Sequence, residues 1–238
     1  MPLYYWETIK PLKRFGTEAT EPGVNQNISF KSKRFRVETE KTDSIYLDEA
    51  ELKEIYKLDL SNEPKLDRSR DLFLLGAWTG LRFSDFSNIK AENIKGNFIE
   101  ITPKKTGVPV VIPIHETVKA IISKYNGKNE NSLPKAISNV AINEHIKEIA
   151  VKIKAFQVKT STGITKGGVN VTRNVSKFAL ITSHTARRSF ATNLFLDGVS
   201  PITIMGITGH KTEKSFLKYI KITPSENAKI LQLLFHIH

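Results

Sequence analysis

Apolar side chains recur at helical spacing along most of this chain, which predicts a mainly helical protein. Asp48 precedes Leu52, Ile55 and Tyr56, which fall on one face of a helix that the aspartate is placed to cap. Ser183 is placed in the same way before a strongly apolar segment. We expect further helices over residues 66–78, 83–90, 117–125, 140–153, 185–196, 201–208, 213–220 and 225–235.

Two short β-rich runs, residues 98–102 and 108–113, interrupt this pattern. They flank Lys104-Lys105-Thr106-Gly107, which predicts a hairpin with exposed lysines at its turn. Residues 158–178, rich in Thr, Val, Gly and Lys, predict a second hairpin that turns at Lys166-Gly167-Gly168. The expected fold class is therefore α+β, mainly helical, with a small antiparallel sheet and hairpins.

The first 43 residues follow a different plan. Residues 4–15 have apolar and basic side chains at helical spacing, and residues 16–27 contain the Gly, Pro and Asn typical of a linker. A single amphipathic helix cannot bury its own apolar face, so we expect residues 4–15 to be the remnant of another domain in a truncated protein. Residues 44–238 form the second expected domain.

Composition narrows the possible functions. The 36 Lys and Arg residues outnumber the 24 Asp and Glu residues and leave a formal charge of +12, which favours a polyanionic partner such as nucleic acid. Charge alone is unspecific, because excess lysine also keeps a protein in solution. The chain has no cysteine, which excludes disulfides, thiolate nucleophiles and cysteine-ligated zinc, so a nucleophile must be an oxygen.

No apolar run approaches the roughly 20 residues that a membrane-spanning helix needs. The start of the chain, Met1-Pro2-Leu3-Tyr4, lacks the basic and then apolar plan of a signal peptide. We therefore expect a cytoplasmic protein without membrane partners.

The candidate chemistry lies in four short motifs. A single His-x-x-Arg or Gly-His is weak evidence, but their joint occurrence in a fixed order is specific. In chain order they are Thr79-Gly80-Leu81-Arg82, Ser183-His184-Thr185-Ala186-Arg187-Arg188, Gly209-His210 and Lys218-Tyr219-Ile220.

With these motifs the chain resembles the tyrosine recombinase family, from about Ser44 to the C-terminus. It is most like the integrases of conjugative transposons and related mobile elements. The resemblance implies the family's catalytic-domain fold and makes residues 1–43 a remnant of the core-binding domain with its linker. It also implies a catalytic set of Arg82, Lys105, His184, Arg187, His210 and Tyr219.

The residue types fit phosphodiester transfer. Planar guanidinium groups bind the nonbridging oxygens in forked, charge-assisted pairs, a role for Arg82 and Arg187. The phenol of Tyr219 has an unperturbed pKa near 10 and needs a base, which the resemblance assigns to His184. It assigns a phosphate hydrogen bond to His210 and protonation of the departing 5′-hydroxyl to Lys105. The product is a 3′-phosphotyrosyl enzyme, formed without cofactor, ATP or metal.

Several positions stay open at this level. Lys104 stands beside Lys105 in the same turn and is its alternative. Asp85 either holds a catalytic arginine or is an exposed helical aspartate without a role, and Arg188 is expected to point off the other helix face from Arg187. The remaining histidines are expected at the surface: His115, His145, His236 and His238.

The resemblance also implies partners. These are double-stranded DNA at attachment sites and Holliday junctions, a homotetramer on DNA formed from monomers, and accessory DNA-bending proteins. The helix over residues 225–235 is expected to dock on a neighbouring protomer or to pack on its own chain. Two other functions remain: relaxation of DNA by a type IB topoisomerase, or regulation by a relative that binds DNA without catalysis.

Overall fold

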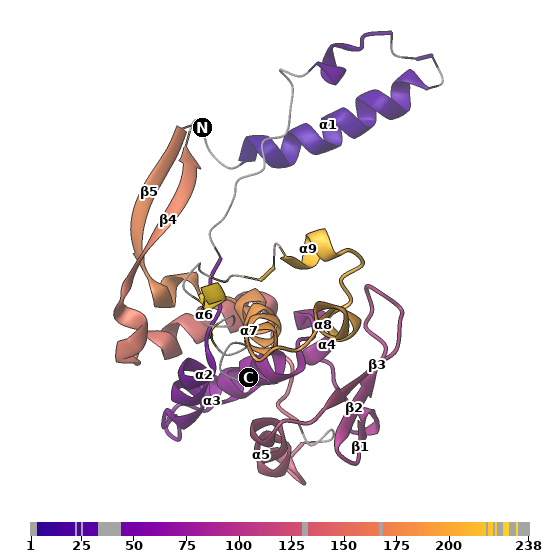
Figure 1. Ribbon diagram of the computed structural model, residues 1–238. Coiled ribbons are helices and arrows are strands. Elements are labelled where there is room, and N and C mark those ends of the chain that lie inside the picture. Colours follow the sequence, from indigo (N-terminus) through magenta and orange to yellow (C-terminus); the bar gives the residue numbers. More distant parts are fainter. Residues whose placement is uncertain are drawn as a thin grey trace. The chain divides into compact units, whose positions relative to one another are not determined.

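The computed structural model describes residues 4–21, 23–24, 26–32, 44–129, 133–166, 169–217, 219–220, 222, 226–228 and 232. Contacts between residues divide the chain into two units. One comprises residues 1–43 and 161–174, and the other comprises residues 44–160 and 175–238. Figure 1 shows the elements of both.

Helix α1, Tyr4–Thr20, belongs to the first unit and is longer than expected. The end expected at residue 15 was wrong, because local bonds carry the helix through part of the predicted linker. Arg14 Nε donates to Glu18 Oε1 at 2.8 Å, one helical turn away. The Thr17 hydroxyl donates to the carbonyl four residues earlier at 2.9 Å. The 3-10 helix η1, Ser29–Lys31, follows.

The hairpin predicted over residues 158–178 is confirmed. Strands β4, Lys159–Lys166, and β5, Val169–Ser176, form a two-stranded sheet. The predicted turn at Gly167-Gly168 lies outside the described residues. The 3-10 helices η3, Lys154–Gln157, and η4, Lys177–Leu180, flank the hairpin.

Helix α3, Pro64–Thr79, is the central element of the second unit. Its residues from Leu72 to Leu75 are at most 1% exposed, as expected where the second half of the helix is apolar on all sides. It packs against α7, Ser183–Leu196, and α6, Asn139–Val151. Helices α2, Glu49–Lys57, and α5, Glu116–Tyr125, also pack on α3 (Figure 1).

None of the helices in the described part of the chain is both long and apolar enough to cross a membrane.

Capping side chains set where two of these helices begin. Asp48 caps α2 as predicted, in a reciprocal capping box with Glu51. The expected cap of α7 was wrong: Thr182 forms the capping box with Thr185. Ser183 is the first helical residue instead, and its hydroxyl donates to Asn139 Oδ1 at 2.8 Å. This bond ties the start of α7 to α6.

The helix expected over residues 83–90 ends early, and a three-stranded antiparallel sheet follows it. Helix α4 covers only Phe83–Phe86, because Ser87 Oγ and the Asn88 amide donate back to helix carbonyls at 2.6 and 2.9 Å. After η2, Ala91–Asn93, the chain forms β1, Ile94–Lys95, β2, Phe98–Ile101, and β3, Val110–Pro113. The strand order is β1-β2-β3, so the predicted hairpin is confirmed and gains a third strand.

A small second core holds the C-terminal part of this unit. Helix α8, Pro201–Thr208, and α9, Glu213–Leu217, meet over the fully buried Phe216. Helix α9 ends before residue 219, so the expectation of a helix over 213–220 was wrong at its end. Residues 226–228 and 232 are helical, and the rest of the helix expected over 225–235 lies outside the described residues.

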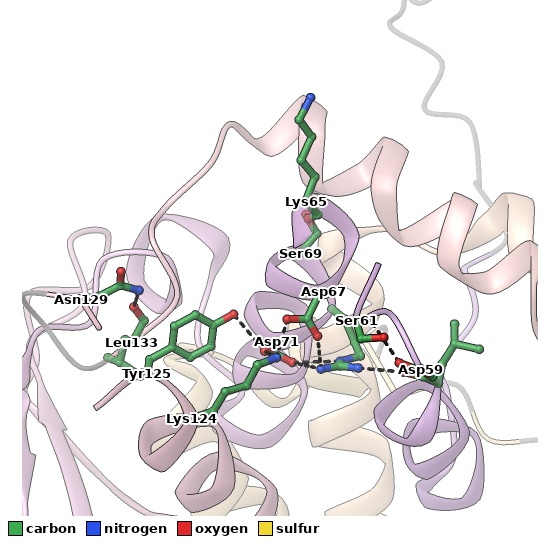
Figure 2. A network of polar contacts seen from close by, with 12 residues as sticks. Asp59, Ser61, Lys65, Asp67, Ser69, Asp71, Lys124, Tyr125, Asn129 and Leu133 are labelled. Carbon is green, nitrogen blue, oxygen red and sulfur yellow. Dashed lines mark hydrogen bonds and ion pairs between the residues drawn. The ribbon is translucent and has the colours of Figure 1, made fainter. Parts of the chain in front are cut away.

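A network of charged side chains joins α3 to α5 (Figure 2). The fully buried Asp71 accepts hydrogen bonds from Arg70 Nε at 2.9 Å, Lys124 Nζ at 2.6 Å and Tyr125 Oη at 3.0 Å. Asp67 binds the same two cations, Arg70 at 2.6 Å and Lys124 at 2.5 Å. The buried carboxylate therefore has a partner on each side, as a charge removed from water requires.

Replacing Asp71 by alanine is expected to destabilise the protein by about 3–5 kcal/mol, because it removes the buried one of the two counter-ions of Arg70 and Lys124 and leaves the Tyr125 hydroxyl without its acceptor. Urea unfolding followed by circular dichroism measures the loss. Asp59→Ala is the matched control, since Asp59 is exposed and accepts from the backbone of Ser61, two residues away, at 3.0 Å. Equal losses in the two variants would contradict a structural role for the network.

Candidate active site

The turn after α3 delivers Arg82. Gly80 ends the helix with φ of 66°, and a side chain there would place Cβ 2.3 Å from Phe190 Cδ1. Only glycine fits both the backbone and the close approach of α7. Arg82 then stands at the N-cap of α4, half-buried, at the junction of the two helices.

Helix α7 contributes three basic side chains to one region. His184, Arg187 and Arg188 are spaced i, i+3 and i+4, so they lie on neighbouring rows of the helix surface. Arg187 is only 3% exposed. Its Nη1 donates to the carbonyl of Gly80 at 2.7 Å, and its Nη2 donates to the carbonyl of Thr208. The guanidinium therefore ties the ends of α3 and α8 to α7.

The end of α8 brings in the loop between β2 and β3. Gly209 caps the helix with φ of 65°. A Cβ at this position would lie 2.8 Å from Thr106 Cγ2 and 3.7 Å from Arg82 Nη1. The absence of a side chain thus lets the loop and Arg82 approach the helix end, next to His210.

Tyr219 lies two residues after the end of α9 and faces these groups. Its backbone N–H donates to the Phe216 carbonyl at 2.7 Å, which anchors the turn to a buried residue. Its Oη is 3.2 Å from His184 Nδ1. The ring centroid lies 4.9 Å from that of His210, 5.7 Å from Arg187 Cζ and 5.2 Å from Arg188 Cζ.

The surroundings of His184 favour its neutral form. Desolvation lowers the pKa of its imidazole, and the positive charges next to it lower that pKa further; in order of effect they are Arg188, Arg187, Arg82 and Lys105. A neutral imidazole offers a lone pair at Nδ1, so it can accept the Tyr219 hydroxyl proton.

The second histidine is neutral as well. Burial, then the charges of Arg187 and Arg82, lower the pKa of His210 to about 4. The Thr208 hydroxyl lies 2.7 Å from the Ile204 carbonyl and 2.8 Å from His210 Nδ1. When this hydroxyl donates to Nδ1, the hydrogen of the neutral imidazole is on Nε2, which can donate it to a phosphate oxygen.

Arg187 stays charged despite its burial. Desolvation lowers its pKa to about 10, while the nearby Tyr219 and Asp85 partly offset that loss. At neutral pH the guanidinium is therefore a fixed positive charge beside the tyrosine ring.

Asp85 holds the β2–β3 loop. The carboxylate is 2% exposed, and its Oδ1 accepts from the Lys104 backbone N–H at 3.1 Å. Within the described part of the chain its Oδ2 is buried without a hydrogen-bond partner. The sequence left two alternatives for Asp85, and the exposed helical aspartate is excluded.

The loop separates its two lysines. Backbone bonds from Thr106 and Gly107 to the Pro103 carbonyl, at 3.2 and 2.9 Å, close a tight turn. Both lysines are exposed. Lys104 lines a neighbouring groove, whereas the charge of Lys105 acts on His184. The choice of Lys105 over Lys104 stays a prediction.

Three expectations about polar residues were wrong. Arg188 was expected off the other helix face, but it lies over the Tyr219 ring. The overlooked signal is its i, i+4 relation to His184. His115 and His145 were expected at the surface, but both are half-buried: His115 stacks on Trp78 at 3.5 Å, and His145 Nδ1 bonds Ser69 Oγ at 2.7 Å.

The chain is similar to known proteins over most of its length. The model of the phage integrase family matches residues 45–226. Tyrosine recombinase XerA of Pyrococcus horikoshii is 29% identical over 175 residues, which are 70% of this chain and 57% of that protein. The chain therefore spans somewhat more than half the length of this curated relative.

Solved structures share the fold. The Tn1549 transposon integrase in complex with circular intermediate DNA has a TM-score of 0.65 at 15% identity, over 96% of this chain and 78% of that chain. A lambda integrase dimer bound to a COC′ core site has a TM-score of 0.64 at 18% identity, over 90% and 71%. The XerA recombinase crystal structure has a TM-score of 0.57 at 18% identity, over 98% and 76%. The expected α+β catalytic-domain fold is confirmed.

Proposed function

This chain belongs to the phage integrase family, and from that premise we propose that it is a site-specific recombinase of a mobile element. It cuts and rejoins DNA through a 3′-phosphotyrosyl intermediate at Tyr219. The observation that carries the proposal is the 3.2 Å contact between Tyr219 Oη and His184 Nδ1, surrounded by arginines.

The proposed reaction assigns a role to each side chain. Tyr219 Oη attacks the phosphorus and loses its proton to His184. Arg82 and Arg187 stabilise the charge on the nonbridging oxygens, and His210 donates a hydrogen bond to one of them. The bond between the phosphorus and the 5′-oxygen breaks as Lys105 donates a proton to that oxygen.

Attack by another strand's 5′-hydroxyl reverses the step and rejoins the DNA. The phosphotyrosyl ester retains the bond energy, so the reaction balances without a nucleotide cofactor.

Lys105 is proposed as the general acid rather than Lys104. The charge of Lys105 is among the causes that lower the pKa of His184, whereas Lys104 lines a groove. The bond from the Lys104 backbone N–H to buried Asp85 holds the loop that carries both lysines.

A basic groove beside the site supports DNA as the partner. Its volume is about 770 Å³, and it is bordered by Lys90, Lys104, Lys128 and Lys135. Among the described residues, none of those that line the groove is acidic; they also include Ser87, Asn88, Ile89, Asn129, Leu133, Pro134 and Ala136. All four lysines are exposed. Such a surface suits a phosphate backbone that continues from the scissile phosphate.

Losing two of these lysines is expected to weaken the salt dependence of DNA binding. For Lys128→Gln with Lys135→Gln, the slope of log K against log salt should decrease in magnitude by about 1.8, because each phosphate contact contributes about 0.9. Fluorescence anisotropy with a 30-base-pair duplex of mixed sequence measures it, in a Tyr219→Phe background that prevents cleavage.

The matched control removes two exposed lysines elsewhere, Lys57 and Lys65, also by substitution with glutamine. An unchanged slope in the groove variant, or an equal change in the control, would show that the groove does not bind the backbone.

The proposed assembly is a monomer in solution and a homotetramer on attachment-site DNA and Holliday junctions, with accessory DNA-bending proteins, in the cytoplasm. Residues 1–43 are proposed as a core-binding-domain remnant with its linker, and residues 44–238 as the catalytic domain. In the free chain the Tyr46 hydroxyl donates to Glu226, so the start of the C-terminal segment packs on its own chain. Docking on a neighbour would then require release of this contact.

The decisive experiment recovers a covalent adduct. Incubation with fragments of the genome that encodes this chain, followed by detergent and nuclease, leaves a phosphotyrosyl peptide whose mass identifies the nucleophile. Mapping to Tyr219 supports the proposal, and no adduct or another tyrosine overturns it. The recovered DNA also defines a site for a strand-exchange assay, which separates recombination from relaxation by a topoisomerase.

A further inference from the structure

Arg188 is the cation of the site that the proposed chemistry leaves without a role. It is half-buried, and its Cζ lies 5.2 Å from the centroid of the Tyr219 ring. Among the described residues its Nε is buried and has no hydrogen-bond partner. A buried donor without a partner is costly for a purely structural side chain, so the position needs another explanation.

The nucleophile needs support from outside its own segment. Tyr219 comes two residues after the end of α9. The bond from its N–H to the Phe216 carbonyl fixes the backbone but does not fix the direction of the ring. A planar guanidinium stacks well on an aromatic face. Arg188 meets this need from α7, the same helix that carries His184.

We propose that Arg188 is a positioning residue for the nucleophile: its guanidinium lies against the Tyr219 ring and keeps Oη beside His184 Nδ1. The inference rests on the proposed function. Helix geometry makes it consistent, because i and i+4 side chains are neighbours on a helix surface and both can reach the same tyrosine.

The position of Arg188 also affects the pKa of His184. The groups that face this imidazole are Arg188 and Arg187 from α7, Arg82 before α4, Lys105 from the loop and Tyr219 after α9. After desolvation, the charge of Arg188 is the largest cause of the lowered pKa of His184. Removing that charge raises the pKa, so His184 becomes neutral, and able to act as a base, only at higher pH.

The test compares Arg188→Met with Arg188→Lys. Single-turnover adduct formation is followed from pH 5 to 9 on a nicked duplex of the recovered site. Methionine is expected to slow the reaction about 10- to 100-fold at pH 7, since small misplacements of reacting groups cost rates of this order. It should also move the rising limb of the pH profile to higher pH. Arg188→Lys keeps the positive charge, so the rising limb is expected to stay at the wild-type pH. It loses the planar stack on the Tyr219 ring, so adduct formation is expected to be slower than in the wild type.

The matched control is Arg68→Met, because Arg68 is also half-buried with an unpaired Nε among the described residues. It lies 12 residues before Gly80 on α3, roughly 18 Å away along the helix axis. Its rate and pH profile are expected to match the wild type. NMR titration of His184 in the free protein gives a second measurement, in which Arg188→Met should raise the pKa.

Each outcome decides a different claim. Suppose that the wild type forms the adduct, but that Arg188→Met changes neither the rising limb of the pH profile nor the pKa of His184. This result overturns the inference alone, even if the rate falls, because a merely structural role lowers the rate equally at every pH. No adduct from the wild-type protein overturns the proposed function and this inference with it.

Discussion

Replacing Tyr219 by phenylalanine is expected to abolish the covalent adduct. The substitution removes only the phenolic oxygen, so the ring keeps its contacts with His210, Arg187 and Arg188. Without an oxygen at 3.2 Å from His184 Nδ1, nothing remains to attack the phosphorus. Gel electrophoresis in detergent with labelled DNA measures the adduct, and the expected signal is at background level.

Tyr56→Phe is the control, because Tyr56 is a 39% exposed tyrosine on α2 that loses the same atom. It should form adduct at the wild-type rate. Binding of Tyr219→Phe to duplex DNA should also remain near the wild-type affinity. Adduct formation by Tyr219→Phe would mean that another residue is the nucleophile, and the proposed reaction would then be wrong.

Arg187→Lys is expected to reduce adduct formation by about 10²- to 10³-fold, the usual loss when one preorganised donor to the transition state is removed. Lysine keeps the charge but cannot form a forked pair with phosphate oxygens. It also lacks the two separate nitrogens with which Arg187 reaches the Gly80 and Thr208 carbonyls.

The structure therefore adds a second effect, a loss of stability of about 1–3 kcal/mol from the carbonyl left unpaired. Single-turnover rates and urea unfolding measure the two effects separately. Arg68→Lys is the control for exchanging a half-buried arginine. Cleavage near the wild-type rate by folded Arg187→Lys would exclude the guanidinium from the reaction.

Most of the helices were predictable because their signals are local. The cap at Asp48, the glycines at 80 and 209 and the proline at 201 act within one or two turns of the chain, and the structure follows them. The failures have the same origin. Helix α4 ended early because Ser87 and Asn88 bond back to its carbonyls, and α1 continued because Arg14 pairs with Glu18. The spacing of apolar residues gives no information about such side-chain bonds.

The candidate site was predictable as a set of residues, since the motifs name them and their order. Its geometry was not. Arg188 was assigned to the wrong surroundings because the direction of a helical side chain has meaning only once the partner element is placed. The contact of Asp85 with the loop spans 19 residues of sequence, and that of His184 with Tyr219 spans 35.

The sequence by itself determined the helical pattern, the hairpins and the basic character, because each depends on residue type and spacing. Its motifs, through their resemblance to a family, named the candidate catalytic side chains. Only the tertiary structure decided what holds the β2–β3 loop and that Arg188 lies over the tyrosine ring. These depend on the packing of α3, α7 and α8. Two glycines without side chains, Gly80 and Gly209, allow that approach, and buried Arg187 then ties the helix ends together.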